Sequence, residues 1–322
     1  MPERHFLIPR PVALSIVLTA LTVGCEHNRT PRSVGFDELF EEHDRVILEE
    51  PDSAPLTGIQ SFAPAAHGRF LVVDEGRPQV RVFEHDGSLS RIVGRYGSGP
   101  GEFRDPKTAV TDSTGRLFVG DWDGAMITRF TSSFAYDTAF QAPGMGIYEM
   151  DWAGDDLVVV LWNEPSEPQD FLVAVMNPED GSLRSAIHPV DSLTWSVPYW
   201  SSFSGPLASA GSARIVTGNT LFYPLHLYTT GGEFIGDFGF EPPSWRQATR
   251  PERGEFVGPP GFDRLVRWRR SSTSLTRLGV LDDSLIVAVH AVHDPTATDL
   301  WSSRDTVMDI YALDGAKLWT DV

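Results

Sequence analysis

The sequence predicts an all-β fold, a β-propeller, of which five units can be read. The first observation is a repeat without a gap, since residues 68–74 (GRFLVVD) match residues 115–121 (GRLFVGD) 47 positions later. The second is the alternation of apolar and polar residues in short runs, which is typical of strands. The third is the recurrence of Asp-Gly or Gly-Gly pairs at 86–87, 180–181, 231–232 and 314–315, where tight hairpin turns are expected.

The five units follow one another along the chain. The first has predicted strands at 61–65, 70–73, 80–83 and 89–93, and the second spans 107–140. The third begins near Ile147, with strands at 157–161 and 171–176. The last two are less complete and have predicted strands at 214–217, 225–228 and 234–238, then at 278–281, 285–290, 308–311 and 317–319. No long segment has helical periodicity, and only 36–42 suggest one or two helical turns.

A sixth unit, which is implied by the resemblance of residues 68–130 to a family of six-bladed propellers, has two possible places. It is either hidden between Trp195 and Arg270, where the pattern is lost, or missing because the chain stops at Val322 one blade short. A closed ring needs every blade edge paired. The strand-like run at 46–48 is a candidate to complete the last blade.

The amino-terminal residues have the pattern of a secretion signal. Arg4 and Arg10 precede a mostly apolar run at 12–23, which Gly24 and Cys25 follow. A run of this length is too short to cross a bilayer core of ~30 Å. The cysteine after the run resembles the lipobox of bacterial lipoproteins, although Thr22 stands where leucine is usual.

This resemblance implies a division of the chain into three parts. Residues 1–24 would be a lipoprotein signal peptide, residues 25–44 a lipidated Cys25 with a polar tether, and residues 45–322 the propeller domain. The implied location is the bacterial cell envelope, facing the periplasm or the exterior, with Cys25 as the membrane attachment. Plain secretion with a leftover cysteine and an uncleaved anchor are the alternatives.

Composition excludes some functions. A net charge of −18 argues against nucleic acid as a partner and against electrostatic docking on anionic lipid. The single cysteine allows no internal disulfide.

The densest part of the repeat also resembles a known family. The spacing Gly97-x-Gly99-Pro100-Gly101-Glu102-Phe103-x-x-Pro106, followed by residues 115–121 and by Ile127 and Phe130, looks like an NHL repeat. More narrowly, it is similar to that of bacterial six-bladed β-propeller lipoproteins. The resemblance is strong over 68–130, moderate to Gly181 and weak beyond.

Two kinds of polar residue invite a metal interpretation. Asp74 and Asp121 end equivalent strands, and because a structural residue recurs in a repeat protein, we expect each to cap the following loop through backbone amides. The alternative is a pair of metal ligands. His290 and His293 lie three residues apart, so that on a strand they point to opposite faces and do not predict a zinc site.

Binding residues are predicted where the blade pattern fails. One group is aromatic and the other is an arginine cluster around a tryptophan, and the named candidates are Trp195, Tyr199, Trp200, Arg264, Arg267 and Trp268. Trp and Arg dominate binding hot spots, so we expect both segments on one face, binding an envelope protein or a small anionic or carbohydrate ligand. The structural alternatives are a core strand for the first segment and, for the second, a helical turn with Leu265 and Trp268 inward.

These observations favour a lipid-anchored extracytoplasmic binding module without catalysis, cofactor or metal. The sequence contains no nucleophile elbow, Walker loop, CxxC or EF-hand loop. Some six-bladed relatives are calcium-dependent lactonases, which leaves a metal-dependent hydrolase, lactonase or lyase as one alternative. A purely structural envelope component is the other. The innermost-strand candidates Gln60, Lys107, Glu149 and Arg277 have mixed charges that do not resemble a carboxylate–amide cage.

Overall fold

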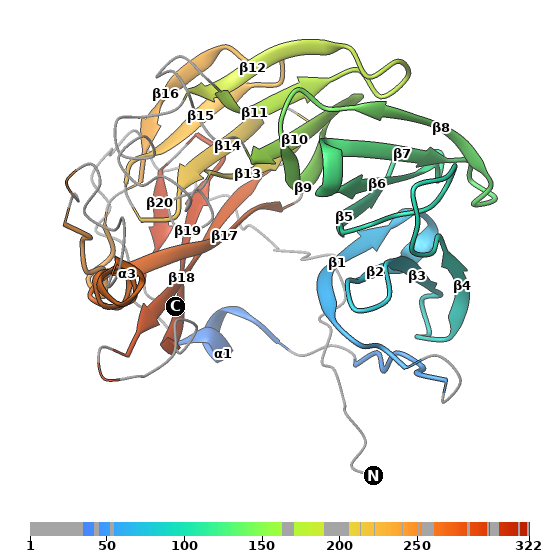
Figure 1. Ribbon diagram of the computed structural model, residues 1–322. Helices are drawn as coiled ribbons and strands as arrows, with labels where there is room; N and C mark the ends of the chain where they lie inside the picture. Colours follow the sequence, from blue (N-terminus) through green and yellow to red (C-terminus); the bar gives the residue numbers. More distant parts are fainter. Residues whose placement is uncertain are drawn as a thin grey trace. The chain divides into compact units, whose positions relative to one another are not determined.

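The computed structural model describes residues 35–41, 45–51, 55–162, 171–189, 206–212, 214–221, 223–239, 241–249, 252, 261–281, 284–294, 296, 303–314, 316–320 and 322. The chain forms two compact units, and the second begins at Phe140. The described residues form five four-stranded sheets, in each of which the strands lie side by side in chain order (Figure 1).

The first unit contains two sheets. The first sheet consists of β1 (Ile59–Ala65), β2 (Arg69–Asp74), β3 (Gln79–Phe83) and β4 (Leu89–Val93). The second consists of β5 (Pro106–Thr111), β6 (Leu117–Asp121), β7 (Met126–Phe130) and β8 (Tyr136–Gln141), whose last residues cross into the second unit.

The second unit contains three sheets. The third sheet consists of β9 (Gly146–Ala153), β10 (Asp156–Trp162), β11 (Phe171–Met176) and β12 (Leu183–Pro189). The fourth consists of β13 (Pro206–Ala210), β14 (Arg214–Asn219), β15 (Leu225–Thr229) and β16 (Phe234–Phe238). The fifth consists of β17 (Thr273–Leu281), β18 (Leu285–His293), β19 (Ser303–Ala312) and β20 (Lys317–Trp319). The predicted strands of all five units are therefore confirmed, with longer bounds for most.

The repeat of 47 residues is confirmed down to the strand register. Phe70 pairs with Phe83 between β2 and β3, and the equivalent residues Leu117 and Phe130 pair between β6 and β7. The same irregularity recurs at the start of the first strands, between Ile59 and Ser61 in β1 and between Pro106 and Thr108 in β5. The two sheets are copies in backbone pairing as well as in sequence.

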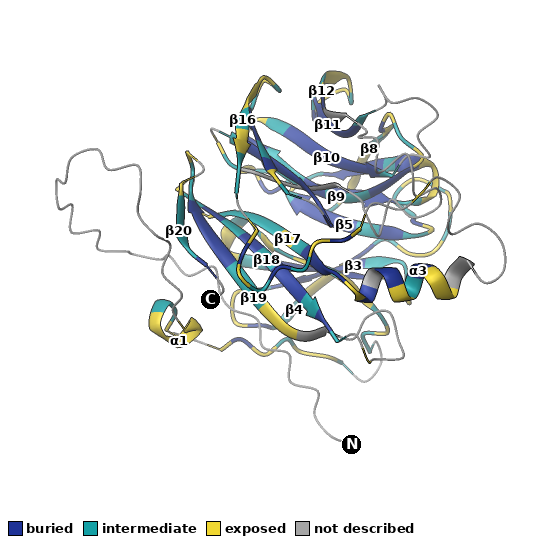
Figure 2. Ribbon diagram, turned by 90° about the vertical axis from the view of Figure 1, so that its left-hand side faces the viewer, coloured by how far each residue is buried: buried dark blue, intermediate teal, exposed yellow. Residues whose placement is uncertain are grey.

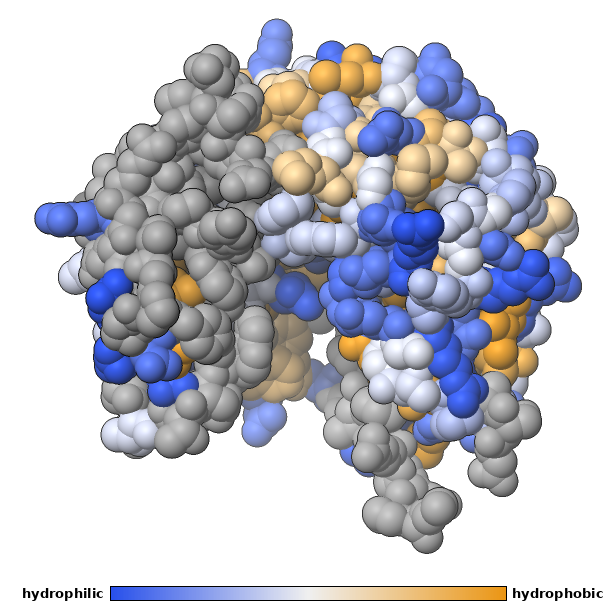
Figure 3. All heavy atoms as spheres, in the orientation of Figure 1, coloured by the Kyte–Doolittle hydropathy of each residue, from blue (hydrophilic) through white to orange (hydrophobic). Residues whose placement is uncertain are grey.

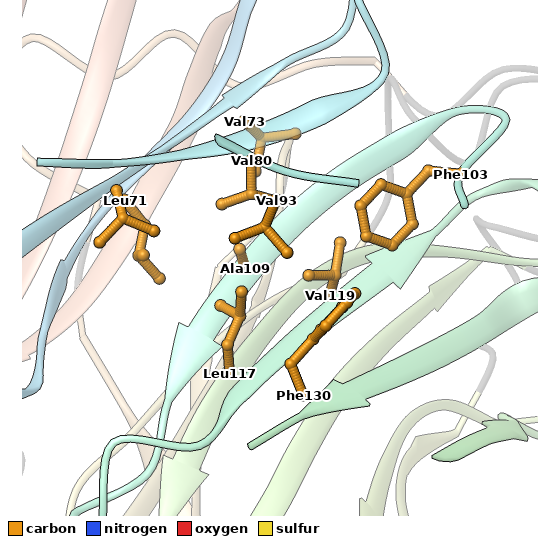
Figure 4. Close-up of a cluster of buried hydrophobic side chains, with 10 residues drawn as sticks. Leu71, Val73, Val80, Val93, Phe103, Ala109, Leu117, Val119 and Phe130 are labelled. Carbon is orange, nitrogen blue, oxygen red and sulfur yellow. The ribbon is translucent and has the colours of Figure 1, made fainter. Parts of the chain in front are cut away.

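Burial explains the composition of the strands. The second and third strands of each sheet in the first unit are buried along most of their length, and β2 is accordingly a nearly continuous apolar run, whereas β3 also buries Arg81, which pairs with Asp74. The fourth strands are mostly exposed and polar, as in β4 and β8. Side chains of the first and second sheets meet in one core, where Leu71, Val73 and Val80 lie opposite Ala109, Leu117 and Val119 (Figure 4).

The second unit has two further cores. One lies between the sheets of β10 and β14, around Val158, Val173 and Ile215. The other lies between the sheets of β14 and β18, around Val216, Leu275 and Ile286. Adjacent sheets in this unit thus pack face to face through buried apolar side chains, as the two sheets of the first unit do.

Two helices interrupt the β structure. Phe36–Leu39 form the short helix α1, which confirms the helical turn expected near residue 36. Gly261–Arg270 form α3, a ten-residue helix that the search for helical periodicity missed. Between β16 and β17 the described residues contain α3 and no strand, so a hidden blade is not found in the described part of that segment.

The possibility that residues 46–48 complete the last blade is wrong. Val46 is buried in a cluster with Phe70, Val72 and Phe83 of the first sheet, and Leu48 packs against the same cluster. The backbone N–H of Glu49 donates to the carbonyl of Gly87, 2.8 Å away. Because the run closely precedes β1, it covers the sheet that follows it, and the last sheet takes all four strands from β17–β20.

Candidate functional site

The residues predicted to bind or to be lipidated fall into two groups. Cys25, Trp195, Tyr199 and Trp200 lie outside the described residues, so the expectation that the aromatic run shares a face with the arginine cluster stays a prediction. Arg264, Arg267 and Trp268 lie on α3.

Helix α3 has one exposed and one buried side (Figure 2). Arg264 and Arg267 are exposed, whereas Leu265 is fully buried and Trp268 is 8% exposed. The indole N–H of Trp268 donates to the carbonyl of Thr249 at 2.7 Å. The helical alternative with Leu265 and Trp268 inward therefore describes the structure, and the binding role of Arg264 and Arg267 stays a prediction.

Asp74 and Asp121 have the recurring structural role expected, with a difference in detail. The Asp74 carboxylate accepts from the backbone N–H groups of Thr57 and Gly58, and Asp121 accepts from those of Arg104 and Asp105, which are 47 positions later. Both aspartates thus hold the segment that enters the first strand of their own sheet. The expectation that they cap the following loop holds only for one bond, from the N–H of Asp123 to Asp121.

The glycine-rich stretch at 94–103 is explained by packing. Gly94 adopts a φ of 79°, and a Cβ there would lie 2.1 Å from the ring of buried Phe103. The Glu102 carboxylate accepts from the N–H of Gly99 at 2.9 Å and pairs with Arg95 at 2.7 Å. These hydrogen bonds hold the pKa of Glu102 below its usual value.

A cavity of about 390 Å³ lies beside this stretch, at the end of the strands where one sheet connects to the next. Its charged side chains bind one another. Arg104 pairs with Asp123 at 3.0 Å and donates to the Ser98 hydroxyl at 2.7 Å. Burial raises the pKa of Asp121, although three backbone N–H groups that donate to its carboxylate act in the opposite direction. The polar groups here are largely committed to holding the loop.

The two histidines of β18 are both buried, with separate partners. His290 Nε2 lies 3.2 Å from the Tyr223 hydroxyl and 3.5 Å from Asp309, and His293 Nε2 lies 2.7 Å from the Ser274 hydroxyl. Lys317 pairs with Asp309 at 3.0 Å. This network links β18, β19 and β20 to the loop after β14, and its connections indicate a structural role.

Charged residues on the first strands of the sheets do not form a metal-type cluster. Lys107 on β5 pairs with Asp105 and Glu75. Burial raises the pKa of Glu149, and the charge of Arg277 on β17 partly opposes this shift. Gln60 is exposed. Among the described residues no group of three or more His, Cys, Asp or Glu side chains could hold a metal ion.

A second cavity, of about 330 Å³, lies in the first unit at the opposite end of the strands, where the hairpin turns are. We call it the turn groove. It is lined by Ala65, Ala66, His67, Arg69, Leu71, Val82, Thr111, Thr114, Gly115, Ser132 and Phe134. Its volume lies at the lower end of the range for small-molecule sites. Both sheets contribute, and the N–H of Ala66 donates across them to the Thr111 hydroxyl at 2.8 Å.

Phe134 departs from the repeat in the turn groove. It has a φ of 64° in the turn between β7 and β8, a conformation that costs a bulky side chain roughly 1–2 kcal/mol. The corresponding residues of three other sheets are Gly87, Gly181 and Gly232, all with positive φ. The turns of Phe134 and Gly87 have matching hydrogen bonds, from Phe134 N–H to Thr131 and from Gly87 N–H to Glu84. Strain of this kind concentrates at functional sites.

Packing accounts for part of this exception. The Phe134 ring is half-buried and packs against the core between the two sheets. The guanidinium carbons of Arg69 and Arg91 each lie 5.9 Å from its centroid. An apolar side chain is thus useful there, yet the turns with Gly87 and Gly232 have the same hydrogen bond and use glycine. We therefore take the turn groove as the candidate functional site.

Comparison with known proteins decides the fold. A family model, DUF5128, described as a 6-bladed beta-propeller, matches residues 24–146. The fold is a β-propeller. Its five described sheets are blades, whereas the matching family model is described as six-bladed. No curated protein matches the sequence.

Solved structures share the propeller fold at low sequence identity. A Bacteroides vulgatus protein of the DUF4221 family has a TM-score of 0.62 and 6% identity, over 84% of this chain and 83% of that one. A Bacteroides fragilis protein described as exported has a TM-score of 0.57 and 11% identity, over 85% and 73%. A Bacteroides thetaiotaomicron extracellular domain, described as part of a hybrid two-component system, has a TM-score of 0.50 and 12% identity, over 86% of this chain and 32% of that domain.

The turn groove was missed in the sequence, although one signal pointed to it. The offset of 47 residues that matched the strands also places Phe134 on Gly87. A bulky residue at a turn position that needs glycine would have marked this blade as different.

None of the helices in the described part of the chain has the length and apolar character of a membrane-spanning segment.

Proposed function

We propose that this propeller binds a small ligand in the turn groove, outside the cytoplasm, and performs no chemistry on it. The observation that carries the proposal is Phe134, a strained residue in the groove where other blades have glycine. The enzyme alternative would need converging carboxylates or amides around a metal ion, and it stays an alternative.

The surface of the first unit is compatible with small-ligand binding. On the face shown in Figure 3, hydrophobic side chains of the described residues are interspersed with hydrophilic ones. A broad docking interface commonly has a contiguous apolar centre. A groove of defined volume suits a small molecule better.

A thermal-shift screen of small carboxylates, sugars and phosphates tests this proposal. A bound ligand raises the melting temperature of the full chain according to its concentration relative to Kd. We expect Phe134→Gly to stay folded, because glycine favours the native φ, and to lose the shift. A ligand whose shift survives both Phe134→Gly and Arg69→Gln would place binding elsewhere.

We also propose that Cys25 is lipidated and attaches the protein to a membrane of the bacterial envelope. The signal-like residues 1–24 support this, and so do the exported and extracellular proteins with the same fold. We retain the NHL-type repeat, with residues 25–44 as the tether and 45–322 as the propeller domain. The arginine cluster of α3 and the aromatic run at Trp195–Trp200 remain proposed contacts for an envelope partner.

Membrane fractionation tests the anchor. The wild-type protein should be recovered with membranes, and Cys25→Ser should be recovered in the soluble fraction, because the thiol is the acylation point. Membrane recovery of Cys25→Ser after removal of the signal would contradict the proposal.

A further inference from the structure

The lining of the turn groove indicates what kind of molecule it binds. Its exposed apolar surface comes mainly from the Phe134 ring, because Leu71 and Val82, which also line it, are almost fully buried. Its charged or titratable side chains are Arg69 and His67, and no carboxylate lines it. In a chain with a net charge of −18, a cationic cavity selects for an anion.

Arg69 has hydrogen-bonding capacity left for that anion. Only its Nε is used, by Glu84 at 3.0 Å, and its side chain is 30% exposed. The two terminal amino groups make no hydrogen bond to the described residues. A guanidinium fork matches the geometry of a carboxylate, with which it forms paired charge-assisted bonds.

Phe134 places an aromatic surface next to this arginine. Its ring lies 5.9 Å from the guanidinium carbon of Arg69, so a ligand held by Arg69 meets the ring within one cavity. Inorganic phosphate would make no use of that ring. A sugar could use the Thr and Ser hydroxyls, but the lining contains no carboxylate or amide side chain to accept from its hydroxyls.

We propose that the turn groove binds a small organic carboxylate with an aromatic body, its carboxylate on Arg69 and its ring against Phe134. His67 also lines the groove and has ring nitrogens that can form a hydrogen bond. The proposal rests on the proposed function, because it names the ligand class of the same groove.

Calorimetric titration of the full chain, purified in detergent, tests the ligand class. The probe is phenylacetate, with acetate and 2-phenylethanol as ligands that each lack one of its two groups. We expect one phenylacetate per chain with a Kd below about 1 mM, and at least about tenfold weaker binding of the other two. Raising the salt concentration should weaken phenylacetate binding, because Arg69 is partly exposed.

Variants assign the contacts. Arg69→Gln should weaken phenylacetate binding about tenfold or more and leave 2-phenylethanol unaffected, and Phe134→Gly should weaken both. Arg104→Gln is the matched control, since Arg104 is also an ion-paired, partly exposed arginine of the first unit but lines the other cavity. Its affinity for phenylacetate should stay unchanged.

The outcomes separate this inference from the proposed function. No phenylacetate binding up to about 10 mM, or equal binding of acetate, would overturn the ligand class. If the thermal-shift screen then finds a sugar or phosphate whose effect is lost in Phe134→Gly, the groove remains a binding site with another ligand. If no ligand depends on Phe134 or Arg69, both proposals fail.

Discussion

At the scale of single residues, the repeat separates structural side chains from those particular to one blade. Asp74 and Asp121 are equivalent and bind equivalent backbone N–H groups. Their neighbours differ, because Arg81 pairs with Asp74 at 3.0 Å with both side chains fully buried, whereas Thr128 stands at the equivalent position in the second blade. The same comparison singled out Phe134 against Gly87.

The two aspartates should differ in their contribution to stability. Asp74→Asn leaves the buried Arg81 without its carboxylate, so we expect a loss of about 3 kcal/mol in the free energy of unfolding. Asp121→Asn removes no such pair and should cost about 1 kcal/mol, since an amide oxygen still accepts backbone N–H groups. Urea unfolding of both variants measures the difference, and equal losses would show that Arg81 tolerates the change.

At the scale of elements, the last blade is joined by a buried polar network. Asp309 on β19 accepts from Lys317 on β20 and from the Tyr311 hydroxyl at 3.1 Å, and it lies near His290 on β18. Burial, the largest effect, raises the pKa of Asp309, but the hydrogen bond to His290 and the charge of Lys317 outweigh it and lower the pKa. Burial is also the main cause of the raised pKa of Tyr311, which keeps its hydroxyl protonated as a donor.

This network predicts a pH dependence of stability. Because the folded pKa of Asp309 lies below the ordinary 3.8, its contribution is complete above that value and is lost as the pH falls through the folded pKa. Asp309→Asn should therefore reduce the loss of stability below about pH 4. Urea midpoints of both proteins from about pH 6 to 2 measure this.

Asp121 supplies the opposite control. Its folded pKa is raised, so its contribution to stability increases as the pH falls through the folded pKa toward 3.8. Asp121→Asn should make the acid loss steeper in that interval. If the urea midpoints of Asp309→Asn and Asp121→Asn changed with pH in the same way, at least one of the two pKa shifts would be wrongly assigned.

At the scale of the whole molecule, each described blade is made from one continuous stretch of chain. The segment before β1 nevertheless belongs to the first blade. Val46, Leu48 and Leu56 pack on its apolar cluster, and Thr57 and Gly58 donate to Asp74. The first blade therefore includes residues from about 45, and the predicted boundary of the propeller domain at residue 45 stays a prediction.

Truncation tests this boundary. A fragment of residues 45–322 should unfold at the same urea concentration as one of residues 35–322, because the side chains of α1 are not buried. A fragment of residues 59–322 should lose about 3 kcal/mol, since it exposes the cluster of Phe70, Val72 and Phe83. Equal stability of the fragments that begin at 45 and 59 would move the boundary to β1.

The sequence by itself determined the blades of this protein. Local alternation sets which side of a strand is buried, and turn residues such as Asp86, Asp112 and Asp180 bind their own following N–H groups, so these features need only neighbours in the chain. For this reason the strands, the hairpins and the equivalence of Asp74 with Asp121 could all be predicted.

Only the tertiary structure decided where the turns of different blades meet and what covers them. Arg69 and Phe134 line one cavity because the first two sheets pack face to face, and Val46 covers the first blade because its apolar cluster is open there. Among the described side chains of helix α3, the buried apolar ones are Leu265 and Trp268, and a short helix depends on such packing for its stability. Contacts between segments distant in the chain arise from the packing of whole sheets, which no local period specifies.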